Sequence, residues 1–334
     1  MRPRLTPAIA DVRRAVREQL ERLELAPKDL ILAACSGGPD SLALAAALAF
    51  EAPRLGLSGG AVIVEHGLQP VTKTVAAETA ETLLALGLSP VEVVEVQVGT
   101  AGGPEAAART ARYEALAATA KKLDARYVML AHTLNDQAET VLLGLARGSG
   151  ARSLSGIAPA AGLYLRPLIG LSRETTESFC RDSGLAAWQD PQNEDPSFSR
   201  VRVRREVLPM LESTIGPGIT EALARTADQL RDDADLLDAQ ATEAFENWAV
   251  QHPNAIEFDC NKLAEAPKAI STRVIKLAID KFRTGAERVH VLAVLQLVTD
   301  WHGQKPLTLP GVRVERKGTT LKLTSTKILR PGAC

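Results

Sequence analysis

The chain has 334 residues and a formal net charge of −1, so it is too long for one ordinary domain and has no overall basic field to attract nucleic acid. Four cysteines, at positions 35, 180, 260 and 334, form no Cys-x-x-Cys pair, which argues against a zinc ribbon, an iron–sulfur site and a disulfide framework. No apolar run approaches the ~20 residues of a membrane helix, and we expect a cytoplasmic protein.

The first half of the chain alternates short apolar runs with helical stretches. After an amphipathic N-terminal helix, we predict strands at 30–34, 61–64, 91–98 and 127–131, and helices at 41–50, 72–86, 104–123 and 135–147. Apolar strands separated by helices of this length indicate βαβ units, and hence an α/β fold with a doubly wound, mainly parallel sheet of the Rossmann-like kind. Such sheets bind ligands at the carboxyl ends of their strands.

The composition changes in the second half. Residues 148–211 are rich in Ser, Pro, Gly and Arg, which predicts loops and short elements packed on the first domain. From Ile219, apolar residues recur at helical spacing over about thirty residues, which predicts a long amphipathic helix. Further helices are expected at 267–282 and 288–301, and a β-hairpin around Lys317 and Gly318. We therefore place a catalytic domain at 1–215 and a smaller, mostly helical C-terminal domain at 216–334.

A glycine turn follows the first predicted strand, in the string Cys35-Ser36-Gly37-Gly38-Pro39-Asp40-Ser41. Adjacent glycines allow a positive φ and a close ligand, and successive N–H groups before a helix suit a phosphate. Asp40 would repel a phosphate unless Mg²⁺ lay between them. The Lys of a Walker A loop is lacking, so transfer of the γ-phosphoryl group is not predicted. The alternative is an ordinary strand–turn–helix junction capped by Asp40 or Ser41.

Two carboxylates follow the fourth predicted strand. Asp136 and Glu139 come shortly after His132 and share one helix face. They could hold a metal or a cationic substrate. The alternative is a surface helix in which acids favour the first turn.

Two groups of arginines are candidates for phosphate contacts. Arg109 and Arg112 lie three apart on one predicted helix, and Arg200, Arg202, Arg204 and Arg205 form the densest basic cluster. A charge run is often just a solvated face, so both roles stay open from spacing alone.

The string Ser-Gly-Gly-x-Asp-Ser after a first strand resembles the loop of the N-type ATP pyrophosphatase (PP-loop) superfamily. The resemblance implies a fold of the adenine nucleotide alpha hydrolase type and cleavage of ATP between its α- and β-phosphates. It also implies a site for ATP and Mg²⁺, with the metal on Asp40. The nucleotide-binding residues would be Ser36, Gly37, Gly38, Pro39, Asp40, Ser41, Glu65 and His66, where Glu65 replaces an aspartate that is usual in one lineage.

A longer set of motifs resembles the tRNA(Ile)-lysidine synthetase family over about 30–211. These motifs are His132-x-x-x-Asp-Gln-Ala-Glu-Thr, Ala111-Arg112-Tyr113, Arg166-Pro167-Leu168, and a segment from Trp188 to Pro209. Thr133, Asn135 and Val201 depart from the pattern, which puts the roles of those positions in doubt.

The resemblance implies a ligase that attaches free L-lysine to carbon 2 of the wobble cytidine in the CAU anticodon of tRNA(Ile). An adenylated cytidine would be the intermediate, and codon recognition would change from AUG to AUA. The implied catalytic residues are Asp40, Arg112, His132, Asp136 and Glu139. The implied tRNA-binding residues are Arg109, Arg112, Arg200, Arg204 and Arg205, together with the C-terminal domain.

Other activities stay open. A related enzyme could thiolate tRNA or form an amide, and an inactive homologue could merely bind tRNA. Thiolating relatives generally carry paired cysteines, which this chain lacks. A homodimer is also open, because the long helix after Ile219 could pair subunits.

Overall fold

A computed structural model describes residues 5–65, 70–97, 99, 103–282 and 287–326. The chain forms two compact units, Met1–Leu230 and Arg231–Cys334, which divide within helix α10 (Ile219–Trp248). The sequence places the domain boundary before this helix, at 216–218, and that assignment stays a prediction. Within the described ranges, no helix is both long enough and apolar enough to cross a membrane.

The first unit is built on a six-stranded sheet of order β3-β2-β1-β4-β6-β5. Its strands are β1 (Leu30–Ala34), β2 (Ser58–Glu65), β3 (Val91–Glu95), β4 (Ala125–Met129), β5 (Ala160–Ala161) and β6 (Tyr164–Leu165). All neighbours pair in parallel except β5, which pairs antiparallel with β6 at the edge. The doubly wound, mainly parallel sheet is thus confirmed. The β5–β6 pair was not predicted, because two-residue strands are too short to give a periodic signal.

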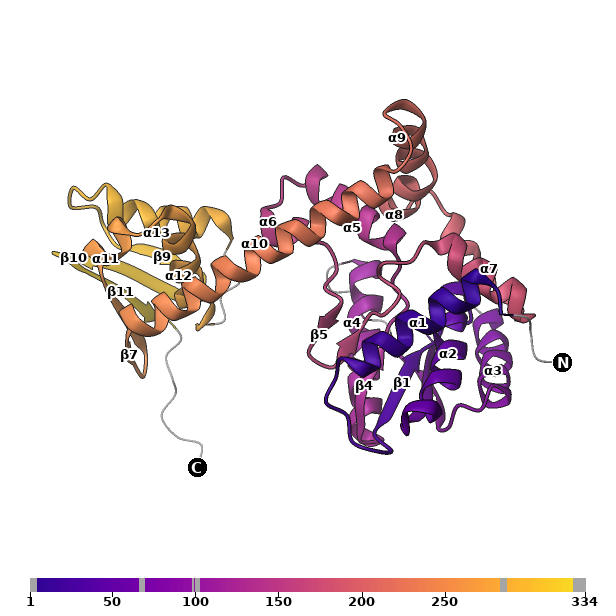
Figure 1. The fold of residues 1–334 in the computed structure, drawn as a ribbon. Coiled ribbons are helices and arrows are strands. Elements are labelled where there is room, and N and C mark those ends of the chain that lie inside the picture. Colours follow the sequence, from indigo (N-terminus) through magenta and orange to yellow (C-terminus); the bar gives the residue numbers. More distant parts are fainter. Residues whose placement is uncertain (1–4, 66–69, 98, 100–102, 283–286, 327–334) are drawn as a thin grey trace. The chain divides into compact units, whose positions relative to one another are not determined.

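Helices cover this sheet on both faces (Figure 1). They are α1 (Pro7–Glu21), α2 (Pro39–Glu51), η1 (Pro53–Leu55), α3 (Pro70–Ala85), α4 (Pro104–Lys122) and α7 (Arg173–Ser183). Helix α5 (Leu134–Ala146) follows β4 in the chain. Successive residues of a strand point to opposite faces. Ile31 and Ala33 of β1 therefore join a core with α1, α2 and α7, whereas Leu32 joins a second core with α4. The chain order reverses between β1 and β4, and ligands bind at such a switch point.

The segment after α5 consists of short elements around α7, as its composition predicted. They are α6 (Ala151–Leu154), η2 (Pro191–Glu194), α8 (Ser199–Arg202), η3 (Val203–Val207) and α9 (Leu208–Thr214). The element η3 is a π-helical turn, a wider helix that is often found at functional sites. Val203 of this turn packs in a small core with Ala138 of α5 and Leu208.

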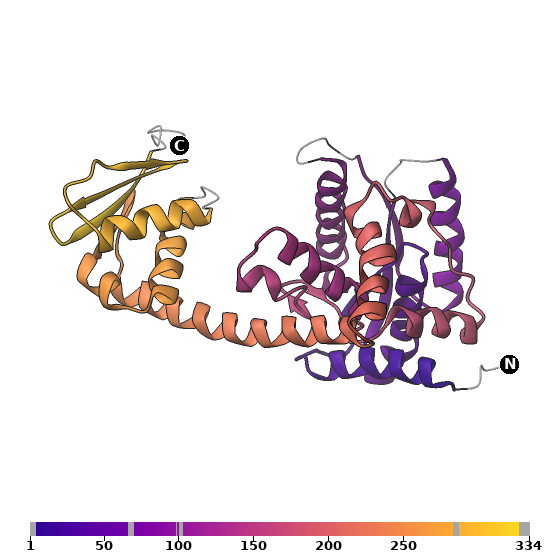
Figure 2. The same ribbon diagram turned by 90° about the horizontal axis from the view of Figure 1, so that it is seen from above.

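The second unit contains a five-stranded antiparallel sheet of order β7-β8-β11-β10-β9. Its elements after α10 are β7 (Val250–His252), β8 (Ala255–Asp259), α11 (Cys260–Glu265), α12 (Lys268–Asp280), α13 (Arg288–Thr299), β9 (Leu307–Leu309), β10 (Val312–Lys317) and β11 (Thr320–Ser325). The predicted hairpin is confirmed as β10 and β11. The other three strands were not predicted. The helices of this unit lie beside its sheet (Figure 2). They share one core with the sheet, which includes Phe258, Leu321 and Leu323.

Candidate active site

The phosphate loop joins β1 to α2 and places two glycines in different conformations. Gly37 has a φ of +84°, and a Cβ atom there would lie 2.7 Å from Thr79 Oγ1, so the fold itself requires glycine. Gly38 is the N-cap of α2 with a φ of −72° and receives no side-chain cap. A Cβ on Gly38 would approach nothing closer than 3.7 Å. Because the helix has no side-chain cap, neither Asp40 nor Ser41 plays the capping role of the alternative interpretation.

Hydrogen bonds within the loop fix its shape. Ser41 Oγ accepts a hydrogen bond from Ser36 N at 3.1 Å and donates one to Gly38 O at 2.9 Å. From outside the loop, Trp188 N donates to Gly37 O at 2.9 Å. Because Ser41 is buried by these contacts and Ser36 is exposed, Ser36 is the more accessible of the two predicted phosphate-binding hydroxyls.

Helix α5 begins after β4 and carries the predicted carboxylate pair. Asp136 Oδ2 accepts hydrogen bonds from Thr133 N at 2.8 Å and Thr133 Oγ1 at 2.9 Å, as part of a capping box. Asp136 thus lies in the first turn of α5 and completes the capping box of the N-cap residue Thr133, a feature that the alternative interpretation would also explain. Glu139, however, has an exposed fraction of 0%, which is inconsistent with an ordinary surface helix. A carboxylate this deeply buried needs a counter-ion.

Arg204 supplies that counter-ion from the π-helical turn η3. Its Nε lies 2.7 Å from Glu139 Oε1, and its Nη2 lies 3.3 Å from Glu139 Oε2. This is the forked geometry in which a guanidinium binds a carboxylate most strongly. The predicted basic cluster therefore divides: Arg204 faces the carboxylate pair, Arg200 donates to Thr140 Oγ1, and Arg205 pairs with Glu194 on the exposed side. Contacts of these arginines with tRNA stay a prediction.

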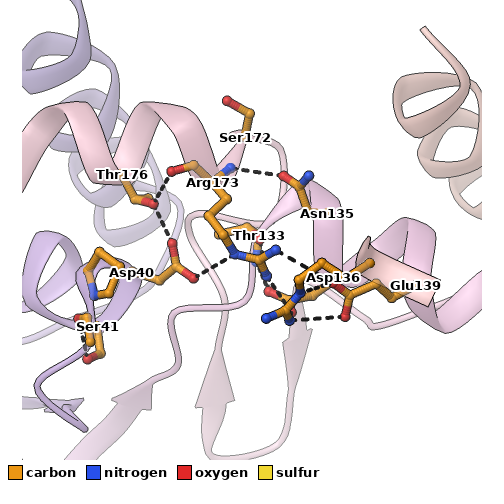
Figure 3. Close-up of polar contacts among 12 residues, drawn as sticks. Asp40, Ser41, Thr133, Asn135, Asp136, Glu139, Ser172, Arg173 and Thr176 are labelled. Carbon is orange, nitrogen blue, oxygen red and sulfur yellow. Dashed lines mark hydrogen bonds and ion pairs between the residues drawn. The ribbon is translucent and has the colours of Figure 1, made fainter. Parts of the chain in front are cut away.

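Arg173, which the sequence did not single out, links the phosphate loop to the carboxylate pair (Figure 3). Its guanidinium lies 3.5 Å from Asp40, 3.3 Å from Asp136 and 3.6 Å from Glu139. Its backbone N–H donates to Asn135 Oδ1 at 2.9 Å. One sequence signal was available. Arg173 is the first residue of α7, where the helix dipole disfavours a cation, so a nearby anion could have been expected.

The pKa values of Asp40 and Asp136, which both contact Arg173, are shifted in opposite directions. Burial raises the pKa of Asp40 above its ordinary value, although a hydrogen bond from the Thr176 hydroxyl and the charge of Arg173 oppose this shift. Burial would also raise the pKa of Asp136. There the charge of Arg173 and the hydrogen bonds from Thr133 outweigh burial and lower that pKa. The surroundings of Asp136 therefore favour its carboxylate form, whereas burial disfavours the carboxylate form of Asp40.

A second polar group surrounds His132 at the end of β4. Burial lowers the pKa of His132 to about 3, with Asp136 opposing the shift and the charge of Arg112 adding to it. Among the described residues, His132 Nδ1, Tyr113 Oη and Arg166 Nε are buried and find no hydrogen-bond partner. Burial likewise lowers the pKa of Arg112. Buried polar atoms normally have partners, so this group is suited to hydrogen-bond a polar substrate.

Glu65 and Arg109, two more of the predicted site residues, contact residues outside the carboxylate pair. Glu65 ends β2, is buried, and accepts a hydrogen bond from the Thr72 hydroxyl. Arg109 is exposed, and its guanidinium lies 5.1 Å from the ring centroid of Tyr113. His66 is outside the described residues. The contacts that we predict for these three residues stay predictions.

Comparison with known proteins shows the family of the chain. Residues 10–211 match the family described as the PP-loop domain. The chain is 54% identical over 299 residues to the tRNA(Ile)-lysidine synthase of Leifsonia xyli subsp. xyli, with 89% of this chain and 90% of the relative covered. It is 47% identical over 298 residues to that of Mycobacterium tuberculosis, with 89% of each chain covered. The chain belongs to the tRNA(Ile)-lysidine synthase family.

Membership of the tRNA(Ile)-lysidine synthase family makes the chain an ATP-using enzyme of the ligase class, as the motifs predicted. Among solved structures, the U34-tRNA thiolase NcsA of Methanococcus maripaludis, which holds a [4Fe-4S] cluster, has a TM-score of 0.56 and 18% identity. That likeness covers 67% of this chain and 79% of the thiolase. At so low an identity it shows a shared fold and carries no argument about the reaction.

Proposed function

We propose that this chain ligates L-lysine to carbon 2 of the wobble cytidine in the CAU anticodon of tRNA(Ile). The O2 oxygen of cytidine attacks the α-phosphorus of ATP, and pyrophosphate leaves. The ε-amine of lysine then bonds to carbon 2, loses a proton, and AMP departs with that oxygen. The product pairs with A instead of G, so the tRNA reads AUA instead of AUG. One observation carries the proposal: a phosphate loop lies within reach of a buried carboxylate pair, with Arg173 contacting both.

The phosphate loop is the proposed seat of the ATP phosphates. The uncapped N-terminus of α2, which begins after Gly38, would present partial positive charge to a phosphate. This charge is aimed where negative charge develops on the departing pyrophosphate. The hydroxyl of Ser36 is positioned to add a further donor.

Asp40 fits the role of a Mg²⁺ ligand. Its carboxylate is partly exposed, with Arg173 at 3.5 Å, and carboxylate oxygens are the ligands that Mg²⁺ prefers. The described residues contain no cluster of three acids, histidines or cysteines for a metal, which suits an ion held chiefly by ATP phosphates and one or two carboxylates. When bound, Mg²⁺ would neutralise charge on the leaving pyrophosphate.

The carboxylate pair is the proposed seat of the lysine side chain. Asp40, Asp136 and Glu139 face two guanidiniums, those of Arg173 and Arg204. An ammonium group that entered this site would be attracted by the carboxylates of Asp136 and Glu139. A carboxylate beside that ammonium could also accept the proton that the amine must lose before it attacks.

Thiolation is the weaker alternative. Cys35, Cys180 and Cys260 are free and buried, so none of the cysteines that the structure describes is exposed for catalysis. Burial also raises the pKa of Cys35 and brings that of Cys180 to about 12, which disfavours the nucleophilic thiolate.

Labelled lysine tests the proposal directly. The protein is incubated with Mg-ATP, labelled lysine and a tRNA(Ile) transcript that bears CAU, beside a control transcript with uridine in place of the wobble cytidine. We expect label in the CAU transcript alone, with equal amounts of AMP and pyrophosphate. Pyrophosphate release without label would favour another adenylating reaction. Binding of tRNA without either product would favour an inactive homologue.

A glycine variant tests the phosphate loop in the same assay. Gly38→Ala adds a methyl group that meets no protein atom within 3.7 Å, so stability should be unchanged. If phosphates lie against this backbone, the methyl group will obstruct them and pyrophosphate release will fall. Unchanged pyrophosphate release at a low ATP concentration would contradict the proposed binding site of the ATP phosphates.

We also propose which residues contact tRNA and where in the cell the reaction takes place. Arg109, Arg112, Arg200, Arg204 and Arg205 and the C-terminal domain would contact tRNA, whose binding would weaken with salt. We propose that the protein is located in the cytoplasm, where tRNA and ATP are both present. Whether two chains pair stays a prediction.

A further inference from the structure

The two guanidiniums of the site are held in different ways. Arg204 has one main carboxylate partner, Glu139, at 2.7 Å. Arg173 has three carboxylate partners, and none is closer than 3.3 Å. Charge-assisted hydrogen bonds between nitrogen and oxygen are normally about 2.7–2.9 Å long. Arg204 is therefore fixed in place, whereas the Arg173 guanidinium is shared loosely among three anions.

Any rearrangement of Arg173 would be confined to its side chain. Its backbone is fixed at the start of α7, where Ser172 caps the helix and Asn135 accepts the Arg173 N–H. The guanidinium already lies between Asp40, at the phosphate loop, and the carboxylates of α5 (Figure 3). A small change in side-chain torsions could shift it from one group to the other.

We propose that Arg173 is a positioning residue that makes lysine binding depend on bound Mg-ATP. In the free protein its guanidinium lies against Asp136 and Glu139 and competes there with the ammonium of lysine. Bound Mg-ATP, which keeps a net negative charge, draws the guanidinium toward its phosphates and so uncovers the carboxylates. This inference rests on the proposed function, because the proposed function assigns ATP and lysine to neighbouring binding sites.

The geometry favours this direction of movement. Phosphates in front of α2 would lie next to Asp40, which Arg173 Nε contacts at 3.5 Å. A guanidinium forms paired, short hydrogen bonds with phosphate, stronger than its present long contacts. Glu139 would keep Arg204 as its counter-ion after Arg173 moves, so the buried carboxylate would never be left without a cation.

The dependence should be measurable as reciprocal coupling. Lysine affinity of the full-length protein is titrated by calorimetry with and without Mg²⁺ and an ATP analogue that carries a methylene group between the α- and β-phosphates. We expect the analogue to tighten lysine binding roughly 5-fold or more in the unaltered protein, the lower end of typical allosteric coupling. In Arg173→Met, lysine should bind more tightly than in the unaltered protein when the analogue is absent. The analogue should then add almost nothing.

Two further variants make the result decisive. Arg181→Met removes an exposed arginine from the same helix, where it contacts Ser178, and should keep the full coupling. Arg173→Lys keeps a cation without the forked geometry and should keep part of it. If Arg173→Met does not fold, the neutral and polar Arg173→Gln takes its place.

The outcomes separate this inference from the proposed function. Coupling of unaltered size in the neutral variants, or none in the unaltered protein, would overturn the inference alone. Weaker lysine binding by Arg173→Met without the analogue would also overturn it, because Arg173 would then be organising the carboxylates instead of competing for them. Failure of the unaltered protein to bind either lysine or the analogue would instead count against the proposed function.

Discussion

At the scale of single residues, the site depends on charges that the protein has removed from water. Glu139 is fully buried, and both of its oxygens pair with Arg204. Such a pair contributes little net stability, but removing one partner leaves the other charge uncompensated. Glu139 should therefore affect both stability and lysine binding.

Glu139→Gln should destabilise the fold by about 2 kcal/mol, within the range for a buried group that loses its partner. Equilibrium unfolding in urea measures this loss. The exposed Glu174 offers a matched control, since Glu174→Gln should change stability by less than about 0.5 kcal/mol. Equal effects of the two substitutions would show that the buried pair is not needed for the fold.

His132 should make stability depend on pH. Its pKa is lowered to about 3, below the ordinary value of 6.5, so the folded protein binds fewer protons than the unfolded chain between these values. The contribution of His132 to the free energy of unfolding is then fully present above pH 6.5. It falls as the pH is lowered, by at most about 1.4 kcal/mol per pH unit. Asp136, whose pKa is also lowered, adds its own loss only below its ordinary value of 3.8.

Urea unfolding at pH 7, 6 and 5 isolates the histidine contribution. His132→Asn cannot take up the proton, so its stability should change less over this interval than that of the unaltered protein. Parallel curves for the two proteins would mean that His132 does not titrate as its burial implies.

At the scale of elements, the apolar pattern predicted what depends on local sequence. The strands β1–β4 and the helices between them follow from apolar runs and their spacing, and the phosphate loop follows from its glycines. The residue Arg173 and its partners could not be predicted in this way. Arg173 and Asp136 are 37 positions apart, and a contact at that separation leaves no periodic trace in the sequence.

The strands β7 and β9 were missed for a related reason. Each has only three residues. Whether so short a segment is a strand is decided by its neighbour in the sheet, and β7 pairs with β8 while β9 pairs with β10.

Gly37→Ala should lower both the stability of the fold and the affinity of the phosphate loop for the ATP analogue. Alanine at a φ of +84° is strained, and its Cβ would collide with Thr79 Oγ1, which together should cost about 1–3 kcal/mol. Unfolding in urea and titration of the ATP analogue measure the two effects. Gly170→Ala is the control, because Gly170 is exposed and its Cβ would meet nothing within 4 Å. Similar behaviour of both variants would mean that the strained turn is not needed for binding.

At the scale of the whole molecule, the chain holds separate hydrophobic cores in its two compact units. The net charge of −1 offers no general attraction for tRNA, which is why we propose that local arginines contact it. The residues of the candidate site all belong to the first unit. Stability of the second core and binding of nucleotide should therefore be separable.

Leu321→Ala tests this separation. Leu321 is fully buried in β11, and its truncation should destabilise the second unit by about 2–5 kcal/mol. Calorimetric unfolding should show one transition moving to lower temperature, while affinity for the ATP analogue stays unchanged. Val289→Ala, at a position that is 63% exposed, should have almost no effect on either quantity. Loss of nucleotide affinity in Leu321→Ala would show that the two units are coupled.

The π-helical turn that carries Arg204 constrains how this segment can change in evolution. Removing one residue from the turn would convert it to ordinary helix and so change the directions in which the side chains of the turn point. A different residue would then face Glu139, and the buried acid would lose its guanidinium. Between Ser199 and Thr214, the chain should therefore tolerate substitutions on its outer face far better than insertions or deletions of a single codon.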